Sequence, residues 1–362
     1  MEPKAQIYAV ATGTGCYIPP VVMKNIDYAK HEFYHENGTR IETSGEEIVT
    51  KFEQITDIRE RRCVAENQVT SDIAALAGKE ALESAGFDPE KLDYIIVSHN
   101  LGDIRYGSTY PDILPTLASR VKQKLGIQNP RCVAYDITFG CPGWTQAAIQ
   151  ANYYIKSGDA KAVLVIGADT LSRAMEPHDR DSMIFADGAG AALFEAQWSD
   201  TPVGILRHVA RTDTSEHLDL LKMDEAYKPE LRGGNLYLKM KGRGVYNYAL
   251  TYVPLLAKEC LDINGLHLRE IKKILIHQAN AKMDEAILKR IFRLYNEKEM
   301  DMNVMPMTIA TLGNSSVATV PTLFDLAVKG KMEGHSLQSG DYVMMTSVGA
   351  GMNINAFMYK MP

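Results

Sequence analysis

The peptide Tyr-Asp-Ile-Thr-Phe-Gly-Cys-Pro-Gly-Trp, residues 135–144, contains the pattern that decides the fold. Its β-prone beginning breaks at the first glycine, and residues 145–156 continue as a helical stretch. Pro142 is typical of the first position of a helix, and Gly158 is typical of the residue just past its end. The pattern therefore predicts a strand-to-helix turn that places Cys141 at the N-terminus of the helix.

The position of Cys141 allows two interpretations. The helix after it is apolar on most faces, which indicates burial. The positive end of a buried helix favours the thiolate, which is the nucleophilic form of cysteine. A cysteine in a protein core is also commonly a small buried hydrophobic residue. The peptide alone does not distinguish a nucleophile from a core residue.

Composition restricts the class of protein. The chain has 362 residues, a net charge of −6 and a pI near 5.9, which argue against a general nucleic-acid binder. Its five cysteines are widely spaced and odd in number, so they are expected to be reduced thiols. No apolar run approaches the length of a membrane span, and the first residues lack a signal-peptide pattern. These features predict a cytoplasmic protein that binds neither nucleic acid nor membrane.

Strand-length apolar runs alternate with helical segments along the whole chain, which predicts an α/β fold with helices layered around largely parallel sheets. The alternation occurs twice, and each part has a strand, a polar turn with a reactive residue, and a helix. The least regular stretch follows residue 198. We therefore expect two related α/β halves, residues 1–198 with the nucleophilic cysteine and residues 199–362 with a histidine and an asparagine.

Two further turns carry residues that suit thiol chemistry. His277 directly follows the apolar strand of residues 274–276, and Asn314 lies in Gly-Asn-Ser-Ser shortly before a helix. Attack of a thiol on a carbonyl group needs a nucleophile, an imidazole that handles protons and donors for the oxyanion. Taken singly, His277 fits a structural histidine and Asn314 fits a turn residue. Together with Cys141 they form a candidate active site.

The sequence resembles the β-ketoacyl-ACP synthase III family of the thiolase superfamily along nearly its whole length. The resemblance rests on motifs at residues 56–62, 140–144, 163–169, 179–180, 185–191, 240–242, 277–280 and 313–316. It implies a thiolase-like fold with central helices sandwiched between mixed sheets, and a homodimer.

The same resemblance implies the roles of individual residues. Cys141 would be the acylated nucleophile, and His277 with Asn314 would support decarboxylation of a malonyl thioester. The backbone N–H groups of Cys141 and of the turn at Ala350 would bind the acyl oxyanion. Arg180 would contact the nucleotide end of coenzyme A.

The implied substrates are thioesters of coenzyme A and of phosphopantetheine, with no metal and no other cofactor. Lys282 would lie at the mouth of the pantetheine channel. The implied partners are an acyl carrier protein, acyl-CoA and malonyl-ACP. Phe139, Trp144 and Met240 would supply apolar contacts for an acyl chain. The function implied is priming of Cys141, followed by decarboxylative Claisen condensation in fatty acid or related biosynthesis.

The sequence departs from the family pattern in places that bear on the acyl donor. Glu47 falls near the position of an adenine-stacking tryptophan, and residues 101–115 differ from the pattern of acetyl-specific members. We therefore hypothesise that an acyl-ACP or a medium-length acyl-CoA primes Cys141 better than acetyl-CoA does. The alternative is that the apolar side chains fill the channel and leave room for acetyl alone.

Alternative functions remain within and outside the superfamily. The chain fits a specialised condensing enzyme of the alkylresorcinol, quinolone or olefin type, or an acyltransferase, and less well a non-catalytic partner subunit. His-Glu-Phe-Tyr-His at residues 31–35 matches a zinc motif, but Asn37 and Gly38 end any helix there and no third ligand is evident. Gly13-Thr-Gly15 imitates a dinucleotide loop, but Pro19-Pro20 prevents the helix that such a loop needs.

Overall fold

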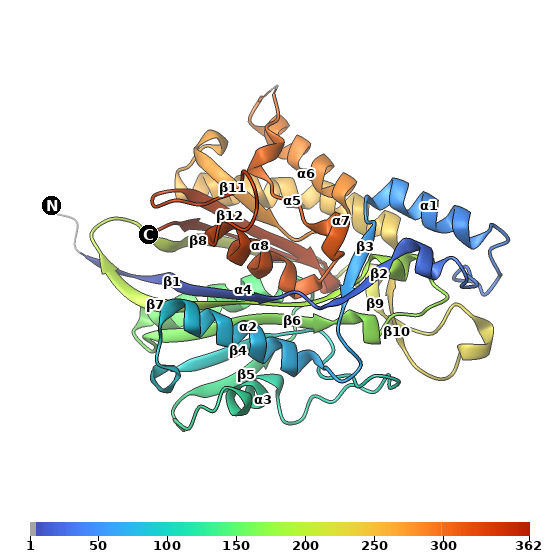
Figure 1. Ribbon diagram of the computed structural model, residues 1–362. Helices are drawn as coiled ribbons and strands as arrows, with labels where there is room; N and C mark the ends of the chain where they lie inside the picture. Colours follow the sequence, from blue (N-terminus) through green and yellow to red (C-terminus); the bar gives the residue numbers. More distant parts are fainter. Residues whose placement is uncertain (1–4, 298) are drawn as a thin grey trace.

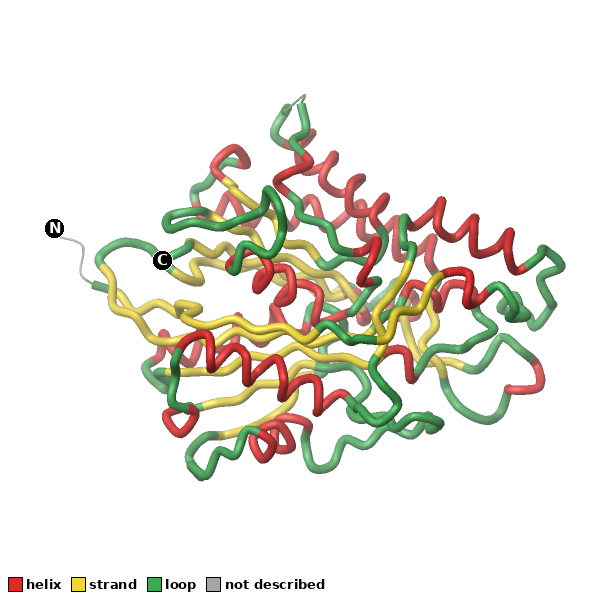
Figure 2. The backbone as a smooth tube through the Cα atoms, in the orientation of Figure 1, coloured by secondary structure: helices red, strands yellow, loops and turns green. Residues whose placement is uncertain are grey.

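The computed structural model describes residues 5–297 and 299–362. Two mixed β-sheets lie face to face, with helices between them and on both outer sides, which gives five layers (Figure 1). The tube in Figure 2 shows the strands of each sheet running roughly along the long axis of the molecule. This layered arrangement agrees with the predicted α/β class, but both sheets mix parallel and antiparallel pairs and are not largely parallel as the alternation of elements predicted.

The first sheet has the strand order β1-β7-β6-β4-β5. Its strands β4 and β5 are parallel to each other, β6 is parallel to β4, and β7 is antiparallel to both β6 and β1. Their bounds are β1 Gln6–Tyr17, β4 Tyr94–Ser98, β5 Val133–Ile137, β6 Ala162–Thr170 and β7 Asp187–Ser199. All of them belong to the first half of the chain.

The second sheet has the order β11-β12-β13-β8 and repeats this pairing pattern. Its first pair, β11 and β12, is parallel, and the next two pairings are antiparallel, as in β4, β6, β7 and β1. The bounds are β8 Gly204–Thr212, β11 Ile271–Ile276, β12 Tyr342–Gly349 and β13 Asn353–Lys360. Residue 198, where the sequence analysis divides the chain, is the last residue but one of β7, and β8 begins at Gly204.

Two central helices, α4 (Gly143–Ser157) and α8 (Thr319–Val328), fill the space between the sheets. Trp144 on α4 is fully buried, its ring packs against Phe194 and Phe357, and its indole N–H donates to the Val165 carbonyl at 3.2 Å. The central core therefore joins side chains of both sheets. It also fixes the N-terminus of α4, just after Cys141, and that of α8, five residues after Asn314.

The outer layers complete the two halves. Helices α2 (Thr70–Ala85) and α3 (Leu117–Lys124) cover the first sheet, while α5 (Gly242–Asn264) and α6 (Ala281–Leu294) cover the second (Figure 1). Each outer helix turns apolar residues toward the sheet that it covers.

The remaining elements gather at one end of the molecule, on the right in Figure 1. Their bounds are α1 Gly45–Thr56, β2 Val21–Lys24, β3 Glu60–Cys63, β9 Leu221–Asp224, β10 Tyr237–Met240 and α7 Ile309–Leu312. They form two small antiparallel sheets and the two helices α1 and α7 beside the central core. In the described part of the chain, no helix combines the length and the apolar character that a membrane span requires.

The predicted turn at Cys141 is present, with one difference. Strand β5 and helix α4 flank it, and Gly158 caps the helix with a left-handed φ of 83°. Pro142 occupies the N-cap rather than the first helical position, because the helix begins at Gly143. Cys141 therefore lies one residue before the cap of α4.

Candidate active site

Cys141 lies where a turn of the first half of the chain meets a turn of the second half. Gly140 has a φ of 66°, and a Cβ atom there would lie 2.8 Å from both the backbone N and O of Ala350. A Cβ atom at Gly349 would lie 2.5 Å from the backbone N of Cys141. Only glycine allows so close an approach of two backbones. The Cys141 and Ala350 turns, which the sequence predicted to bind an oxyanion, are therefore packed directly against each other.

Ser316 connects all three predicted catalytic residues. Its hydroxyl group donates to Cys141 Sγ at an Oγ–Sγ distance of 3.4 Å. Its backbone N–H donates to Asn314 Oδ1 at 2.9 Å, and its backbone lies close enough to the His277 ring to raise the pKa of the imidazole. Thus the structure brings Cys141, His277 and Asn314 together around one serine.

Asn314 is buried and held in place through its backbone. Its N–H donates to the Ile184 carbonyl at 3.0 Å, and its own carbonyl accepts from the N–H of Ala186 at 2.8 Å. The preceding Gly313 has a φ of 72°, and a Cβ atom there would lie 2.7 Å from the Cβ of Arg61. The turn at Asn314 is thus fixed on the first half of the chain.

His277 extends strand β11 and is buried. Its backbone N–H donates to the Thr346 carbonyl at 2.9 Å. Burial lowers the pKa of the imidazole to about 4, and the nearby Ser316 backbone only partly opposes this. Nδ1 of the ring is buried without a hydrogen-bond partner among the described residues. The imidazole is therefore neutral at pH 7.

The Cys141 thiol is not activated in the resting structure. Burial raises its pKa to about 12, the charge of Asp169 adds to this, and the hydrogen bond from Ser316 opposes it. The sequence predicted that the helix terminus favours the thiolate. In the resting site, loss of water around a side chain that is 9% exposed outweighs this effect and the other favourable contacts.

An apolar cavity of about 160 Å³ opens beside Cys141. Its wall includes Asn100, Gly140, Ser316 and Ala350. The apolar side chains of the wall are Leu101, Leu171, Phe185, Leu221, Met223 and Leu238. The space suits a hydrocarbon group attached to the sulfur of Cys141.

A second cavity, of about 460 Å³, lies between helices α1, α5 and α6. Arg180 and Met240 form part of its wall, as the sequence predicted for substrate-binding residues, and so does Glu47. Ala279 and Asn280, which follow His277 by two and three residues, also line it. This cavity is large enough to receive part of an extended substrate near the histidine.

Three other predicted substrate-binding residues lie elsewhere. Lys282 is exposed, and its Nζ donates to the Gln54 carbonyl. Phe139 is half-buried and lines neither cavity. Trp144 belongs to the central core, so the structure corrects its predicted contact with an acyl chain. Its large ring fills the space between the two sheets.

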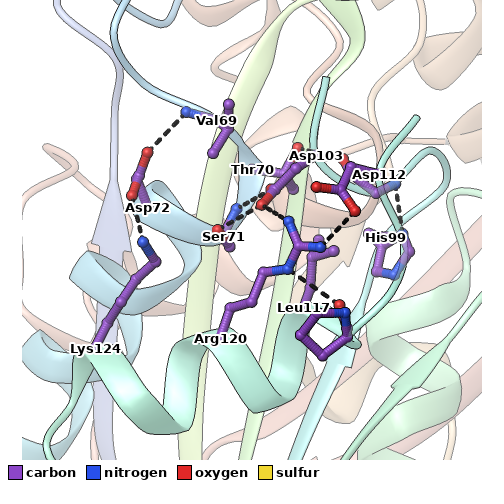
Figure 3. A network of polar contacts seen from close by, with 12 residues as sticks. Val69, Thr70, Ser71, Asp72, His99, Asp103, Asp112, Leu117, Arg120 and Lys124 are labelled. Carbon is purple, nitrogen blue, oxygen red and sulfur yellow. Dashed lines mark hydrogen bonds and ion pairs between the residues drawn. The ribbon is translucent and has the colours of Figure 1, made fainter. Parts of the chain in front are cut away.

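The loop between β4 and α3, residues 99–116, is held by a polar network (Figure 3). The Arg120 guanidinium pairs with Asp103 at 2.8 Å and with Asp112 at 2.6 Å. Asp103 also accepts hydrogen bonds from the backbone N–H and the hydroxyl of Ser71, both at 2.7 Å. Asn100 and Leu101 belong to this loop and line the cavity at Cys141. The network that holds the loop therefore fixes one wall of that cavity.

Sequence reasoning missed Ser316 and Asn100. Ser316 was part of the Gly-Asn-Ser-Ser motif, but only its neighbour Asn314 was assigned a role. Asn100 follows the carboxyl end of strand β4, where polar residues of parallel sheets often serve a site. Its Nδ2 lies 2.9 Å from Ser316 Oγ. The position of Asn100 just after strand β4 is the sequence signal that points to it.

The described residues offer no convincing metal site. Residues 31–35, the match to a zinc motif, form no helix, so His31 and His35 lack the helical spacing that the motif requires. Cys16, Glu80 and Asp325 lie near one another elsewhere. There the ammonium group of Lys329 pairs with both carboxylates and supplies the positive charge.

We expect His277 to make stability depend on pH. The ordinary pKa of 6.5 applies to the unfolded chain, whereas burial lowers the folded value to about 4, so the unfolded chain binds the proton first. The contribution of His277 to the free energy of unfolding is therefore fully present well above pH 6.5 and falls by roughly 1 kcal/mol per pH unit between pH 6 and pH 5.

His277→Asn is expected to remove this component of the slope, measured by urea unfolding at pH 7.5, 6 and 5. The exposed His35, substituted in the same way, serves as the control and should leave the slope unchanged. Parallel slopes for His277→Asn and the unsubstituted protein would show that the ring is not buried in its neutral form.

Comparison with known proteins places this geometry in a family. The model for 3-oxoacyl-[acyl-carrier-protein] synthase III matches residues 135–214, and the model for its C-terminal part matches residues 261–361. The β-ketoacyl-[acyl-carrier-protein] synthase III 1 of Vibrio vulnificus is 35% identical over 346 residues, which cover 95% of this chain and 97% of that one.

Solved structures agree with the sequence comparison. The 3-oxoacyl-[acyl-carrier-protein] synthase III of Aquifex aeolicus has a TM-score of 0.77 at 30% identity, covering 97% of this chain and 99% of that one. A priming β-ketosynthase from a polyketide biosynthetic pathway has a TM-score of 0.80 at 26% identity, covering 99% and 98%. The predicted thiolase-like fold is confirmed. The chain belongs to the 3-oxoacyl-[acyl-carrier-protein] synthase III family, condensing enzymes of the acyltransferase class.

Proposed function

We propose that this protein transfers an acyl group from a thioester to Cys141 and then condenses it with a malonyl thioester. The observation that carries the proposal is the meeting of Cys141, His277 and Asn314 at Ser316, beside an apolar cavity. Each residue type fits one step of that chemistry. The relatives in the family support the same reaction class.

In the first half-reaction the sulfur of Cys141 attacks the carbonyl carbon of the acyl donor. The new carbon–sulfur bond forms as the donor thiol leaves, and the proton of Cys141 ends on that thiol. The charge on the carbonyl oxygen would be stabilised by the backbone N–H groups of Cys141 and Ala350. The contact of Gly140 with Ala350 supports this role, because it holds the two turns together.

In the second half-reaction a malonyl thioester loses carbon dioxide, and the resulting enolate attacks the acyl carbon on Cys141. A carbon–carbon bond forms, the carbon–sulfur bond to Cys141 breaks, and the sulfur leaves as a thiolate that takes up a proton from water. The enolate oxygen requires hydrogen-bond donors that do not protonate the carbon nucleophile. A neutral imidazole at His277 and the carboxamide of Asn314 meet this requirement. The low pKa of His277, about 4 because of burial, supports its role as a neutral donor.

Substitution of the nucleophile tests the proposal directly. We expect Cys141→Ala to abolish acyl transfer and leave the fold intact, since the change removes a single sulfur atom. Mass spectrometry after incubation with acyl-CoA and acyl-ACP would locate the acyl group. Cys132→Ala, at a cysteine buried elsewhere, is the control and should retain acylation. An acyl group on any other cysteine contradicts the assignment.

The two half-reactions should respond differently to loss of His277 or Asn314. We expect His277→Ala and Asn314→Ala to reduce malonyl decarboxylation by about a hundredfold or more, with a smaller effect on acylation of Cys141. The enolate charge develops only in the second half-reaction. Release of carbon dioxide and single-turnover acylation would be measured separately. Equal losses in both would contradict the division of roles.

The cavity at Cys141 supports an acyl donor longer than acetyl. Its volume is about 160 Å³. A dry apolar cavity of about 150 Å³ in another protein holds benzene, a molecule of about six carbon atoms. An acetyl group would leave most of the space empty, whereas each buried methylene contributes about 0.8 kcal/mol. We therefore infer that a chain of about six carbons fits best.

Acylation rates of Cys141 should be highest for hexanoyl among acetyl, hexanoyl and decanoyl donors, tested on both coenzyme A and the carrier protein. Leu238→Trp fills the cavity and should reduce the hexanoyl rate about tenfold while acetyl changes little. Leu236→Trp, at an exposed neighbour, is the matched control. A maximum at acetyl in the unsubstituted protein would exclude the longer primer.

The larger cavity supports a carrier-bound substrate. Lys51, Arg180 and Arg243 line it together with Glu47 and Asp181, and Lys282 is exposed on helix α6 next to lining residues. Cations around such an opening suit the phosphate of coenzyme A or phosphopantetheine and an acidic carrier protein. The likeness to a priming polyketide β-ketosynthase favours one alternative, a specialised condensing enzyme with the same chemistry. Identification of the product would distinguish an enzyme of fatty acid biosynthesis from a specialised condensing enzyme.

We further propose that two copies of the chain form a dimer. Strand β5 is at the edge of the first sheet. In the nearby loop, Tyr106, Tyr110, Ile113 and Leu114 are 59% to 84% exposed although the loop is firmly anchored (Figure 3). A second copy that covers the edge and the loop would bury these side chains.

Sedimentation measurements are expected to give twice the mass of one chain. Tyr110→Asp should shift the protein toward the monomer, because a buried carboxylate would lack a partner. Leu218→Asp replaces an exposed apolar residue in another part of the surface, and it should leave the mass unchanged. A monomer without any substitution would refute the dimer.

A further inference from the structure

The hydroxyl group of Ser316 lies between Cys141 and a buried amide–carboxylate pair. Asn100 Nδ2 is 2.9 Å from Ser316 Oγ, and Cys141 Sγ is 3.4 Å from the same oxygen. An amide nitrogen donates and does not accept. The Ser316 oxygen therefore accepts a hydrogen from Asn100, and its single hydroxyl hydrogen is directed to the sulfur of Cys141, with the Asp169 carboxylate as the competing acceptor.

Asp169 fixes which way the Asn100 amide points. Its carboxylate accepts the Asn100 backbone N–H at 2.8 Å and Asn100 Nδ2 at 2.6 Å. With the amide turned around, its oxygen would face the carboxylate and both contacts of Nδ2 would be lost. Asp169 is 1% exposed, so water does not replace these contacts. The orientation of the amide thus follows from the buried carboxylate.

The backbone of Ser316 is held in an unusual conformation. Its φ is 55°, in the left-handed region that side chains other than glycine rarely adopt. The N–H bond to Asn314 keeps it there, close to the His277 ring. Such strain is maintained where the surrounding structure requires one placement of the side chain. At Ser316 that placement puts the hydroxyl beside the nucleophile.

We propose that Asn100 and Asp169 orient the Ser316 hydroxyl so that it donates its hydrogen to the sulfur of Cys141 and stabilises the thiolate. In this arrangement Ser316 is the donor, and Asn100 and Asp169 are positioning residues that act through it. The inference rests on the proposed function, in which Cys141 is the nucleophile. It adds a device that prepares that nucleophile.

The electrostatic surroundings show why this orientation matters. Burial and the charge of Asp169 on β6 raise the pKa of Cys141, whereas the Ser316 hydrogen bond lowers it. His277 follows β11, and its buried ring has a lowered pKa, so it brings no positive charge at pH 7. His99, at the end of β4, acts on Asp169, whose own pKa is raised to about 6 by burial. Ser316 is thus the side chain that lowers the pKa of Cys141 and so favours the thiolate.

Alkylation of Cys141 by iodoacetamide tests the proposal without any acyl donor. The reagent reacts with the thiolate, and mass spectrometry of the Cys141 peptide separates it from the other cysteines. We expect Ser316→Ala to reduce the rate at pH 7 about tenfold and to move the pH profile upward, as loss of one hydrogen bond to a charged group predicts. Alanine keeps the Cβ atom, so the backbone can keep its conformation at this position.

Asn100→Ala should produce a similar reduction, since the free hydroxyl would then turn toward Asp169. In the Ser316→Ala background, Asn100→Ala should have no further effect on the profile. That result distinguishes a residue that acts through Ser316 from one that merely supports the fold. Should Asn100→Ala fail to fold, Ser316→Ala alone still decides whether the donor affects the sulfur.

Ser315→Ala is the matched control, because the Ser315 hydroxyl contacts Thr319 at 3.2 Å and makes no contact with Cys141 in the described structure. It should leave the alkylation profile unchanged. An unchanged profile in Ser316→Ala would overturn the inference, as would an additive effect in the double variant. Failure of the proposed function would look different: Cys141 would alkylate as expected and would accept no acyl group from any donor.

Discussion

The site depends on the conformation of one residue, Ser316, whose left-handed backbone joins the two halves of the chain. Its hydroxyl group reaches Cys141 of the first half, while its backbone holds Asn314 and lies close to the ring of His277 in the second. A left-handed serine is less favourable than a helical or extended one. The contacts on three sides compensate for this, so the site and the packing of the halves stabilise each other.

Glycine residues make this meeting of the halves possible. Gly140 and Gly313 both have positive φ, and a side chain on either would enter the backbone or side chains of the opposing segment. At Gly167 on β6, an added Cβ atom would lie 2.5 Å from the Val317 carbonyl, directly after Ser316. The site is therefore built from backbone in close contact, which allows amide groups to face a substrate oxygen without intervening side chains.

Local patterns predicted the elements that carry the site, and long-range contacts explain what those patterns missed. The strand, turn and helix around Cys141 follow from residues that are adjacent in sequence, as does the cap at Gly158. The contact of Ser316 with Cys141 joins residues 175 positions apart, which no local pattern encodes. Trp144 follows the nucleophile closely in sequence, yet the helix turns its ring into the core. The raised pKa of Cys141 likewise depends on burial by distant segments.

The two central side chains are both uncharged at rest, and this bears on the order of events. In Cys–His sites that hold a thiolate and an imidazolium, the proton of the thiol has moved to the ring. Here burial raises the pKa of Cys141 and lowers that of His277, so the thiol does not pass its proton to the ring. A neutral ring keeps its N–H as a donor for the enolate without supplying a proton that would quench the carbon nucleophile. The burial that makes the thiol less reactive is thus the same burial that suits His277 to the later step, and a local donor to the sulfur is needed to offset it.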